Sequence, residues 1–182
     1  MDNIKTEKIL FVGDAMCGKT SILQVFTKGH FPQGCYTPTI FENEVADMSY
    51  KKKHFKLFLV DSSGQEDWQH IRSLLYCDVE VIVIVCSIDS IDSLENVREY
   101  WVPEIKEFAP PGIPKLLVAN KKDLRDGSKD QIEYKEGEIM AKEIGAYAYL
   151  ECSALRYEGI EEIFFSIVKL LKKNTGCSCV IL

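Results

Sequence analysis

The sequence has no apolar run long enough to span a membrane and no recognisable secretion signal. Its longest apolar run, Val79–Ile88, has ten residues and includes Glu80, so it is too short for a spanning helix and is typical of a buried strand. The seven cysteines are irregularly spaced, without the CxxC pair or Cys/His pattern of a zinc site. These absences argue against a disulfide-stabilised secreted protein and favour a reducing cytoplasm.

Positively charged residues are fewer than negatively charged ones. The chain has 22 Lys and Arg against 28 Asp and Glu, a net charge of −6, which argues against nucleic acid as a partner. The remaining composition, 46% hydrophobic and 27% charged over 182 residues, is that of one folded domain without repeats. We predict a domain over residues 1–173, followed by a flexible tail over residues 174–182.

Runs rich in Val, Ile and Leu alternate with stretches of helical period. This pattern predicts an α/β fold, with a six-stranded, mostly parallel sheet and helices on both faces. The predicted strands cover residues 7–13, 43–49, 55–61, 79–86, 114–119 and 147–152. The predicted helices cover residues 18–28, 66–75, 91–107, 133–144 and 158–172. Only the short polar segment Tyr50–His54 joins the second and third strands, so these two should be antiparallel.

Residues Gly13, Gly18, Lys19 and Thr20 fit the pattern GxxxxGK[ST], between a predicted strand and a predicted helix. In this pattern, backbone N–H groups at a helix N-terminus bind phosphate oxygens. Lys19 would stabilise the terminal phosphates, and the Thr20 hydroxyl would bind Mg²⁺. A glycine-rich turn without a ligand is the alternative, and the flanking strand and helix argue against it.

A second motif, NKKD at Asn120–Asp123, follows another predicted strand and so lies at the same edge of the sheet. The Asp123 carboxylate can accept two hydrogen bonds from guanine, whereas adenine has no matching donor pair. Asn120 and Lys121 lie in the same loop and complete the motif. Alone, the motif is equally typical of a solvated loop, but after a phosphate loop it predicts GTP or GDP as the ligand.

The segment DSSGQE lies between these motifs, with Asp61 at the end of the third predicted strand. Asp61 would bind Mg²⁺ through water, Gly64 would donate its N–H to the terminal phosphate, and Gln65 would orient the attacking water. Thr39 is the candidate second protein ligand of Mg²⁺, in a loop ordered by the third phosphate. Taken singly, Asp61 and Thr39 are equally typical of turns. The predicted catalytic residues are therefore Gln65, Lys19 and Thr39.

Together these motifs resemble the Ras superfamily of small GTPases, and more closely its Rho subfamily, over nearly the whole chain. The segments FENEVADM, GQEDW, CSIDSIDSLENVREYWVPEIKEF, NKKDLRD and ECSAL carry the Rho-like resemblance. It implies the P-loop small-GTPase fold, with Phe31 packed on the edge of guanine. It also implies that Ser153 and Ala154 support Asp123 and the guanine carbonyl. Further nucleotide contacts are assigned to Ala15, Met16, Cys17, Ser21, Tyr36 and Leu155.

The resemblance also implies partners and a location. Residues 34–43 and 62–76 would be two switches that bind guanine-nucleotide exchange factors, GTPase-activating proteins, a dissociation inhibitor and effectors such as formins or kinases. The final CVIL resembles a prenylation box with Cys179 as the lipidated residue, and Cys177 is a candidate second lipid site. We expect a monomer at the cytoplasmic face of the plasma membrane and in the cytosol, signalling to the actin cytoskeleton.

The chain departs from the Rho pattern beside the expected terminal phosphate. Ala15 replaces the second glycine of the phosphate loop, and Ser63 replaces an alanine. One extra carbon in a packed site costs about 1–3 kcal/mol, on the order of tenfold to a hundredfold in rate. The segment after NKKD is too short for the extra helix of Rho proteins. The first switch contains one more residue, including Gly34, and Leu155 replaces a lysine.

These features leave three functions open. The first is a membrane-anchored GTP/GDP switch that hydrolyses GTP slowly. The second is a recruitment module that stays bound to GTP, suggested by Ala15 and Ser63. The third, a P-loop kinase or ATPase, is disfavoured by Asp123 and by the lack of a basic lid segment.

Overall fold

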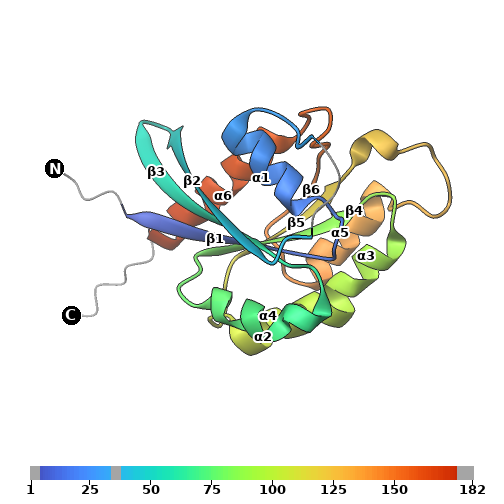
Figure 1. Cartoon of the computed structure of the whole chain (residues 1–182), viewed down its shortest axis with the longest axis horizontal. Coiled ribbons are helices and arrows are strands. Elements are labelled where there is room, and N and C mark those ends of the chain that lie inside the picture. Colours follow the sequence, from blue (N-terminus) through green and yellow to red (C-terminus); the bar gives the residue numbers. More distant parts are fainter. Residues whose placement is uncertain (1–4, 34–37, 176–182) are drawn as a thin grey trace.

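The computed structural model describes residues 5–33 and 38–175, and its centre is one six-stranded sheet in the order β2-β3-β1-β4-β5-β6 (Figure 1). The strands are β1 (Thr6–Val12), β2 (Phe41–Tyr50), β3 (Lys53–Ser62), β4 (Val81–Ser87), β5 (Lys115–Asn120) and β6 (Tyr149–Glu151). β2 and β3 are antiparallel, and the other neighbouring pairs are parallel. The predicted fold class and its one antiparallel pair are confirmed.

The central strand β4 is buried along its whole length, so the sheet must be covered on both faces. Ile82 and Ile84 belong to one hydrophobic cluster, whereas Val81 and Val83 belong to a second. Successive side chains of a strand point to opposite faces, so this alternation gives the domain two hydrophobic layers that share one sheet.

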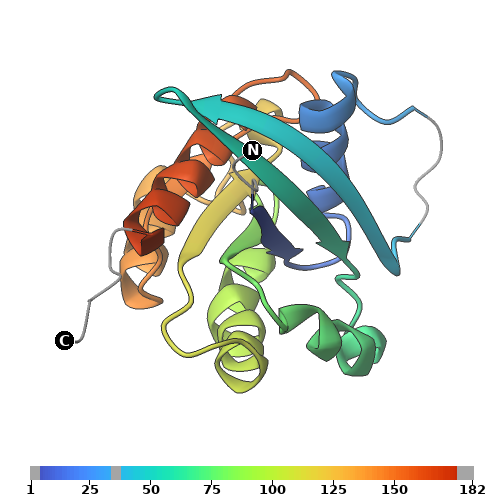
Figure 2. The ribbon, with the colours of Figure 1, turned by 90° about the vertical axis from the view of Figure 1, so that its left-hand side faces the viewer.

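Helices cover both faces, as Figure 2 shows. One face carries α1 (Lys19–Lys28) and α6 (Ile160–Thr175). The other carries α5 (Tyr134–Glu143) and one helical run formed by α3 (Ile91–Asn96), the π-helical η3 (Val97–Trp101) and α4 (Val102–Phe108). Periodicity predicts this run as one helix over 91–107, without its π segment. In the described part of the chain, no helix is both long and apolar enough for a transmembrane span.

The prediction of one helix over residues 66–75 is wrong in detail. This segment is divided into a 3₁₀ turn η1 (Glu66–Trp68), a single α turn α2 (Gln69–Arg72) and a second 3₁₀ turn η2 (Ser73–Tyr76). Arg72 is buried here and donates to the backbone carbonyls of Ser63 and Gln65. Tertiary hydrogen bonds thus hold the segment in place of a regular helical ladder, which periodicity does not reveal.

The loop between β5 and α5 is short. It begins with a 3₁₀ turn, η4 (Lys122–Leu124), and residues 125–133, all described, form turns and bends without a helix. The expectation that this chain lacks the extra helix of Rho proteins is therefore confirmed.

Candidate functional site

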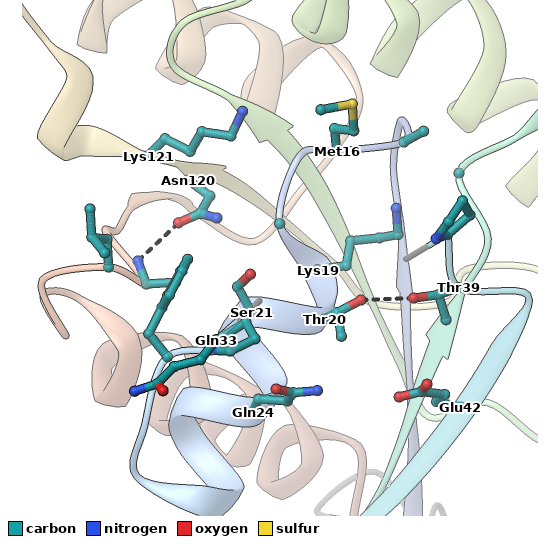
Figure 3. Close-up of a pocket in the computed structure, with 18 of the residues that line it drawn as sticks. Met16, Lys19, Thr20, Ser21, Gln24, Gln33, Thr39, Glu42, Asn120 and Lys121 are labelled. Carbon is teal, nitrogen blue, oxygen red and sulfur yellow. Dashed lines mark hydrogen bonds between the residues drawn. The ribbon is translucent and has the colours of Figure 1, made fainter. Parts of the chain in front are cut away.

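A pocket of about 560 Å³ lies where β1, β3, β5 and β6 end, a usual place and size for a small-molecule site in an α/β fold. It is lined by many of the predicted nucleotide contacts: Ala15, Met16, Gly18, Lys19, Thr20, Ser21, Phe31, Thr39, Gly64, Asn120, Lys121, Asp123, Ala154 and Leu155. Figure 3 shows how residues from separate loops face this common space. Tertiary folding thus brings the predicted motifs together.

The phosphate loop is held by tight backbone contacts. A Cβ on Gly13, whose φ is +139°, would lie 2.0 Å from the carbonyl oxygen of Val85, so the loop approaches β4 too closely for a side chain. Lys19 crosses the loop, and its Nζ donates to the carbonyl oxygens of Gly13 at 2.7 Å and Asp14 at 2.9 Å. Burial lowers the pKa of Lys19, while the nearby Asp61 carboxylate opposes this shift.

Oxygen atoms suited to a divalent cation meet beside Lys19. The Oγ1 atoms of Thr20 and Thr39 are 3.0 Å apart (Figure 3). Thr20 Oγ1 also donates to Asp61 Oδ2 at 2.5 Å. Asp61 is 2% exposed, and its Oδ1 is buried without a hydrogen-bond partner. Burial raises the pKa of Asp61 to about 6. Hydroxyl and carboxylate oxygens suit Mg²⁺, and a cation or its water would satisfy the unpaired Oδ1.

The other end of the pocket contains the NKKD loop. Ser153 Oγ donates to Asp123 Oδ1 at 2.5 Å, which orients the carboxylate. Asn120 connects three segments, since its Nδ2 donates to the carbonyl of Cys17 at 3.0 Å and its Oδ1 accepts from the Ala154 N–H at 3.1 Å. The Asn120 side chain therefore fixes the phosphate loop relative to the base-side loops.

Several predicted residues lie just outside the pocket lining. Gly13, Cys17, Asp61 and Ser153 lie behind it and act through the contacts described above. Gln65 is exposed, and its Oε1 accepts from Trp68 Nε1 at 3.1 Å. The pocket lining does not include Gln65. Tyr36, Gly34, Cys177 and Cys179 lie outside the described residues.

The two residues that depart from the Rho pattern have different surroundings. Ala15 lines the pocket, and its backbone N would be 2.2 Å from a Cβ on Gly64, so these two residues are in direct contact. Ser63 is 2% exposed, and its hydroxyl accepts from the Gln65 N–H at 3.2 Å. The Ser63 hydroxyl therefore stabilises the turn that contains Gln65.

Sequence reasoning missed part of this site. The pocket is also lined by Gln24, Pro32, Gln33, Pro38, Glu42, Ser62 and Leu124. Tyr157 was missed as well, although its hydroxyl accepts from the Phe31 N–H at 2.9 Å across 126 residues of sequence. Some of these lining residues neighbour Phe31 or Thr39 in the sequence, and this proximity could have indicated them. No local sequence pattern indicates Tyr157.

Comparison with protein-family models gives a match over most of the chain. The model described as the Ras family matches residues 8–173, which run from β1 into α6 and include every described segment of the pocket.

Proposed function

The chain belongs to the Ras family of small GTPases, and from that premise we propose that it is a Rho-like GTP/GDP switch with slow hydrolysis. Membership establishes a small GTPase that binds guanine nucleotides. The observation that supports the proposal best is the convergence of the phosphate loop, the Thr20–Thr39–Asp61 oxygens and the NKKD loop on one pocket. Each group alone is ambiguous, and their convergence supports a guanine-nucleotide site.

The residues have separate roles in this proposal. The loop N–H groups and Lys19 stabilise charge on the phosphates, because a fixed cation costs no reorganisation during the reaction. Thr20 and Thr39 would hold Mg²⁺ directly and Asp61 through water, and the ion would neutralise charge that develops on the phosphate oxygens. Asp123, oriented by Ser153, would accept the guanine N–H groups. Gln65 would orient the attacking water once its side chain leaves Trp68.

Two features support slow hydrolysis. Ala15 lines the pocket at the point where its backbone already contacts Gly64, so its methyl group would take space close to the expected terminal phosphate. In addition, the Gln65 amide oxygen is held by Trp68 and Gln65 does not line the pocket, so this hydrogen bond must break before Gln65 can act. The same two features favour the alternative function, a recruitment module that remains bound to GTP.

Single-turnover phosphate release from the GTP-loaded, Mg²⁺-containing protein distinguishes these functions. We expect slow release by the wild type and release on the order of tenfold to a hundredfold faster by Ala15→Gly. Gln65→Leu is the control, and it should slow the release strongly while leaving a measurable residual rate. If neither wild type nor Ala15→Gly releases phosphate while both retain GTP, the recruitment module is the better description. Competition by ATP against bound GDP would instead support a kinase or ATPase.

We further propose that the partners are those of a Rho-like protein. Exchange factors, activating proteins and effectors such as formins or kinases would bind the segments 34–43 and 62–76, and a dissociation inhibitor would bind the lipidated form. The motifs FENEVADM and GQEDW support this assignment. Partners that require the extra Rho helix are not expected, because the described residues 125–133 contain no helix. Cys179 would attach the protein to the cytoplasmic face of the plasma membrane.

A further inference from the structure

Arg72 is a fully buried charge that the proposed chemistry leaves unexplained. It is 1% exposed and forms a two-pronged ion pair with Glu104 of α4, with Nε–Oε1 and Nη2–Oε2 distances of 2.6 Å. Tyr76 also donates to Glu104 Oε1, at 2.8 Å. Such a pair is expensive to bury and contributes little net stability, so stability alone does not explain it.

The guanidinium also holds the turn on both sides of Gly64. Arg72 Nη1 donates to the carbonyl oxygens of Ser63 at 2.8 Å and Gln65 at 3.0 Å. Gly64, between them, contacts the backbone of Ala15 in the phosphate loop. A single nitrogen atom of Arg72 therefore holds both residues that flank Gly64, where the Gln65 turn meets that loop.

The same helical run also anchors the phosphate loop. Both carboxylate oxygens of Asp14 are occupied, since Trp101 Nε1 donates to Oδ1 at 2.7 Å and Asn96 Nδ2 donates to Oδ2 at 2.8 Å. These donors are five residues apart: Asn96 directly precedes the π segment η3, and Trp101 is its last residue. A π turn aligns residues i and i+5, whereas a regular α-helix would separate them around its axis.

Trp101 joins the two anchors. Its ring lies 4.6 Å from the guanidinium carbon of Arg72, a cation–π distance, while its N–H holds Asp14. Five residues, Asp14, Asn96, Trp101, Arg72 and Glu104, thus form one network, which we name the Arg72 network. It connects the phosphate loop to the Gln65 turn through the α3–α4 run.

We propose that Arg72, Trp101 and Asp14 are positioning residues for GTP hydrolysis, which hold the turn Ser63–Gln65 in register with the phosphate loop. This inference rests on the proposed hydrolytic function. None of the three needs to touch the nucleotide through its side chain. Their effect is to restrict where Gly64 and Gln65 can lie when the water attacks, and misplacement of such groups by a fraction of an ångström is costly in rate.

Trp101→Phe tests the network, because phenylalanine retains a ring over Arg72 but lacks the N–H that Asp14 accepts. We expect single-turnover hydrolysis to fall about tenfold, the effect of losing one hydrogen bond to a charged group. The dissociation rate of bound GDP should change less than about threefold, because the pocket itself is retained. Phe164→Leu is the matched control, since it removes a buried ring from the opposite face of the sheet.

A lower Tm together with an equal loss of hydrolysis in Trp101→Phe and Phe164→Leu would overturn the proposal. Asn96→Ala provides a second test at an exposed position, where a folding defect is not expected, and it should also slow hydrolysis. An Asn96→Ala variant with wild-type hydrolysis would equally count against the network.

A double-mutant cycle with Gln65→Leu separates positioning from general damage. If the network acts through the Gln65 turn, Trp101→Phe has a clearly smaller effect on residual hydrolysis in the Gln65→Leu protein than in the wild type. Fully multiplicative losses would overturn the proposal. If Gln65→Leu alone leaves hydrolysis unchanged, the proposed role of Gln65 fails, and the comparison of Trp101→Phe with Phe164→Leu still decides whether the network matters.

Discussion

At the scale of single residues, Asp61 shows how burial prepares a group for its ligand. One carboxylate oxygen accepts from Thr20 and the other has no partner, so the charged form is poorly stabilised in the protein alone. Burial therefore raises the pKa of Asp61 to about 6. A bound cation would compensate the buried negative charge and so favour the ionised form of Asp61.

This pKa predicts a pH dependence of Mg²⁺ binding. Protonated Asp61 is neutral and cannot attract the ion, so affinity falls as the pH drops below about 6. Between pH 7 and pH 5 we expect Mg²⁺ affinity to weaken by about tenfold. Titration of Mg²⁺ against the release of a fluorescent GDP would measure this. Asp61→Asn should bind Mg²⁺ weakly at both pH values, and an equal pH dependence in that variant would assign the titration to another group.

At the scale of elements, the loop of the β2–β3 hairpin consists of two residues with a strained backbone conformation. Strand pairing continues to Tyr50 and Lys53, so only Lys51 and Lys52 form the loop. Their φ values are +48° and +64°, as a two-residue hairpin turn of the I′ type requires. Positive φ is costly for residues with a Cβ, and lysine has no side-chain group that compensates. The turn is therefore dictated by the pairing of its strands.

Replacing Lys51–Lys52 with Asn-Gly should relieve this strain. We expect a gain of about 1 kcal/mol in the free energy of unfolding and a Tm about 2–4 °C higher for a domain of this size. Thermal unfolding followed by circular dichroism would measure the change. Lys53→Gly is the control, since it places glycine within β3 and should lower the Tm. A lower Tm for the Asn-Gly variant would show that the lysines contribute more than the strain costs.

At the scale of the whole molecule, the pocket and the end of α6 lie toward opposite ends of the strands. The pocket follows the carboxyl ends of the parallel strands. The turn of the β2–β3 hairpin lies at the opposite end of the strands, where β1 begins, and α6 runs beside the hairpin (Figure 1). Tyr50 of the hairpin lies 6.1 Å from the ring of Phe165 and 4.8 Å from Lys172 Nζ. Attachment through Cys179, four residues after Thr175, would therefore leave the pocket accessible to partners.

A vesicle-binding measurement tests this attachment. After prenylation in vitro, the wild-type protein should float with vesicles that contain anionic lipid, whereas Cys179→Ser should remain in solution. One prenyl group gives reversible binding, so the wild type should redistribute on dilution. GDP affinity should be equal in the two proteins, because Cys179 lies in sequence beyond the segments that line the pocket. Equal flotation of the two proteins would assign membrane binding to another feature.

The sequence alone determined the order of the hydrophobic runs, the phosphate loop and the NKKD loop. These features are local, because a strand, a turn and a helix N-terminus are encoded by neighbouring residues. Strand ends in a parallel sheet meet at one edge, so the positions of Lys19, Asp61 and Asp123 along the chain are enough to predict that they share one site. The division of residues 66–75 into three short turns is not predictable in this way, since it depends on a distant partner, Glu104.

Only the tertiary structure decided which side chains connect these motifs. Trp101 is a buried core residue, and its N–H also binds Asp14 across 87 residues of sequence. Asn120 likewise reaches Cys17 across 103 residues, and Tyr157 reaches Phe31 across 126. Composition and periodicity predict whether a residue is buried or exposed within its own helix or strand. Contacts of this kind depend on how separate elements pack, because a hydrogen bond forms wherever the fold places a donor beside an acceptor, at any distance along the chain.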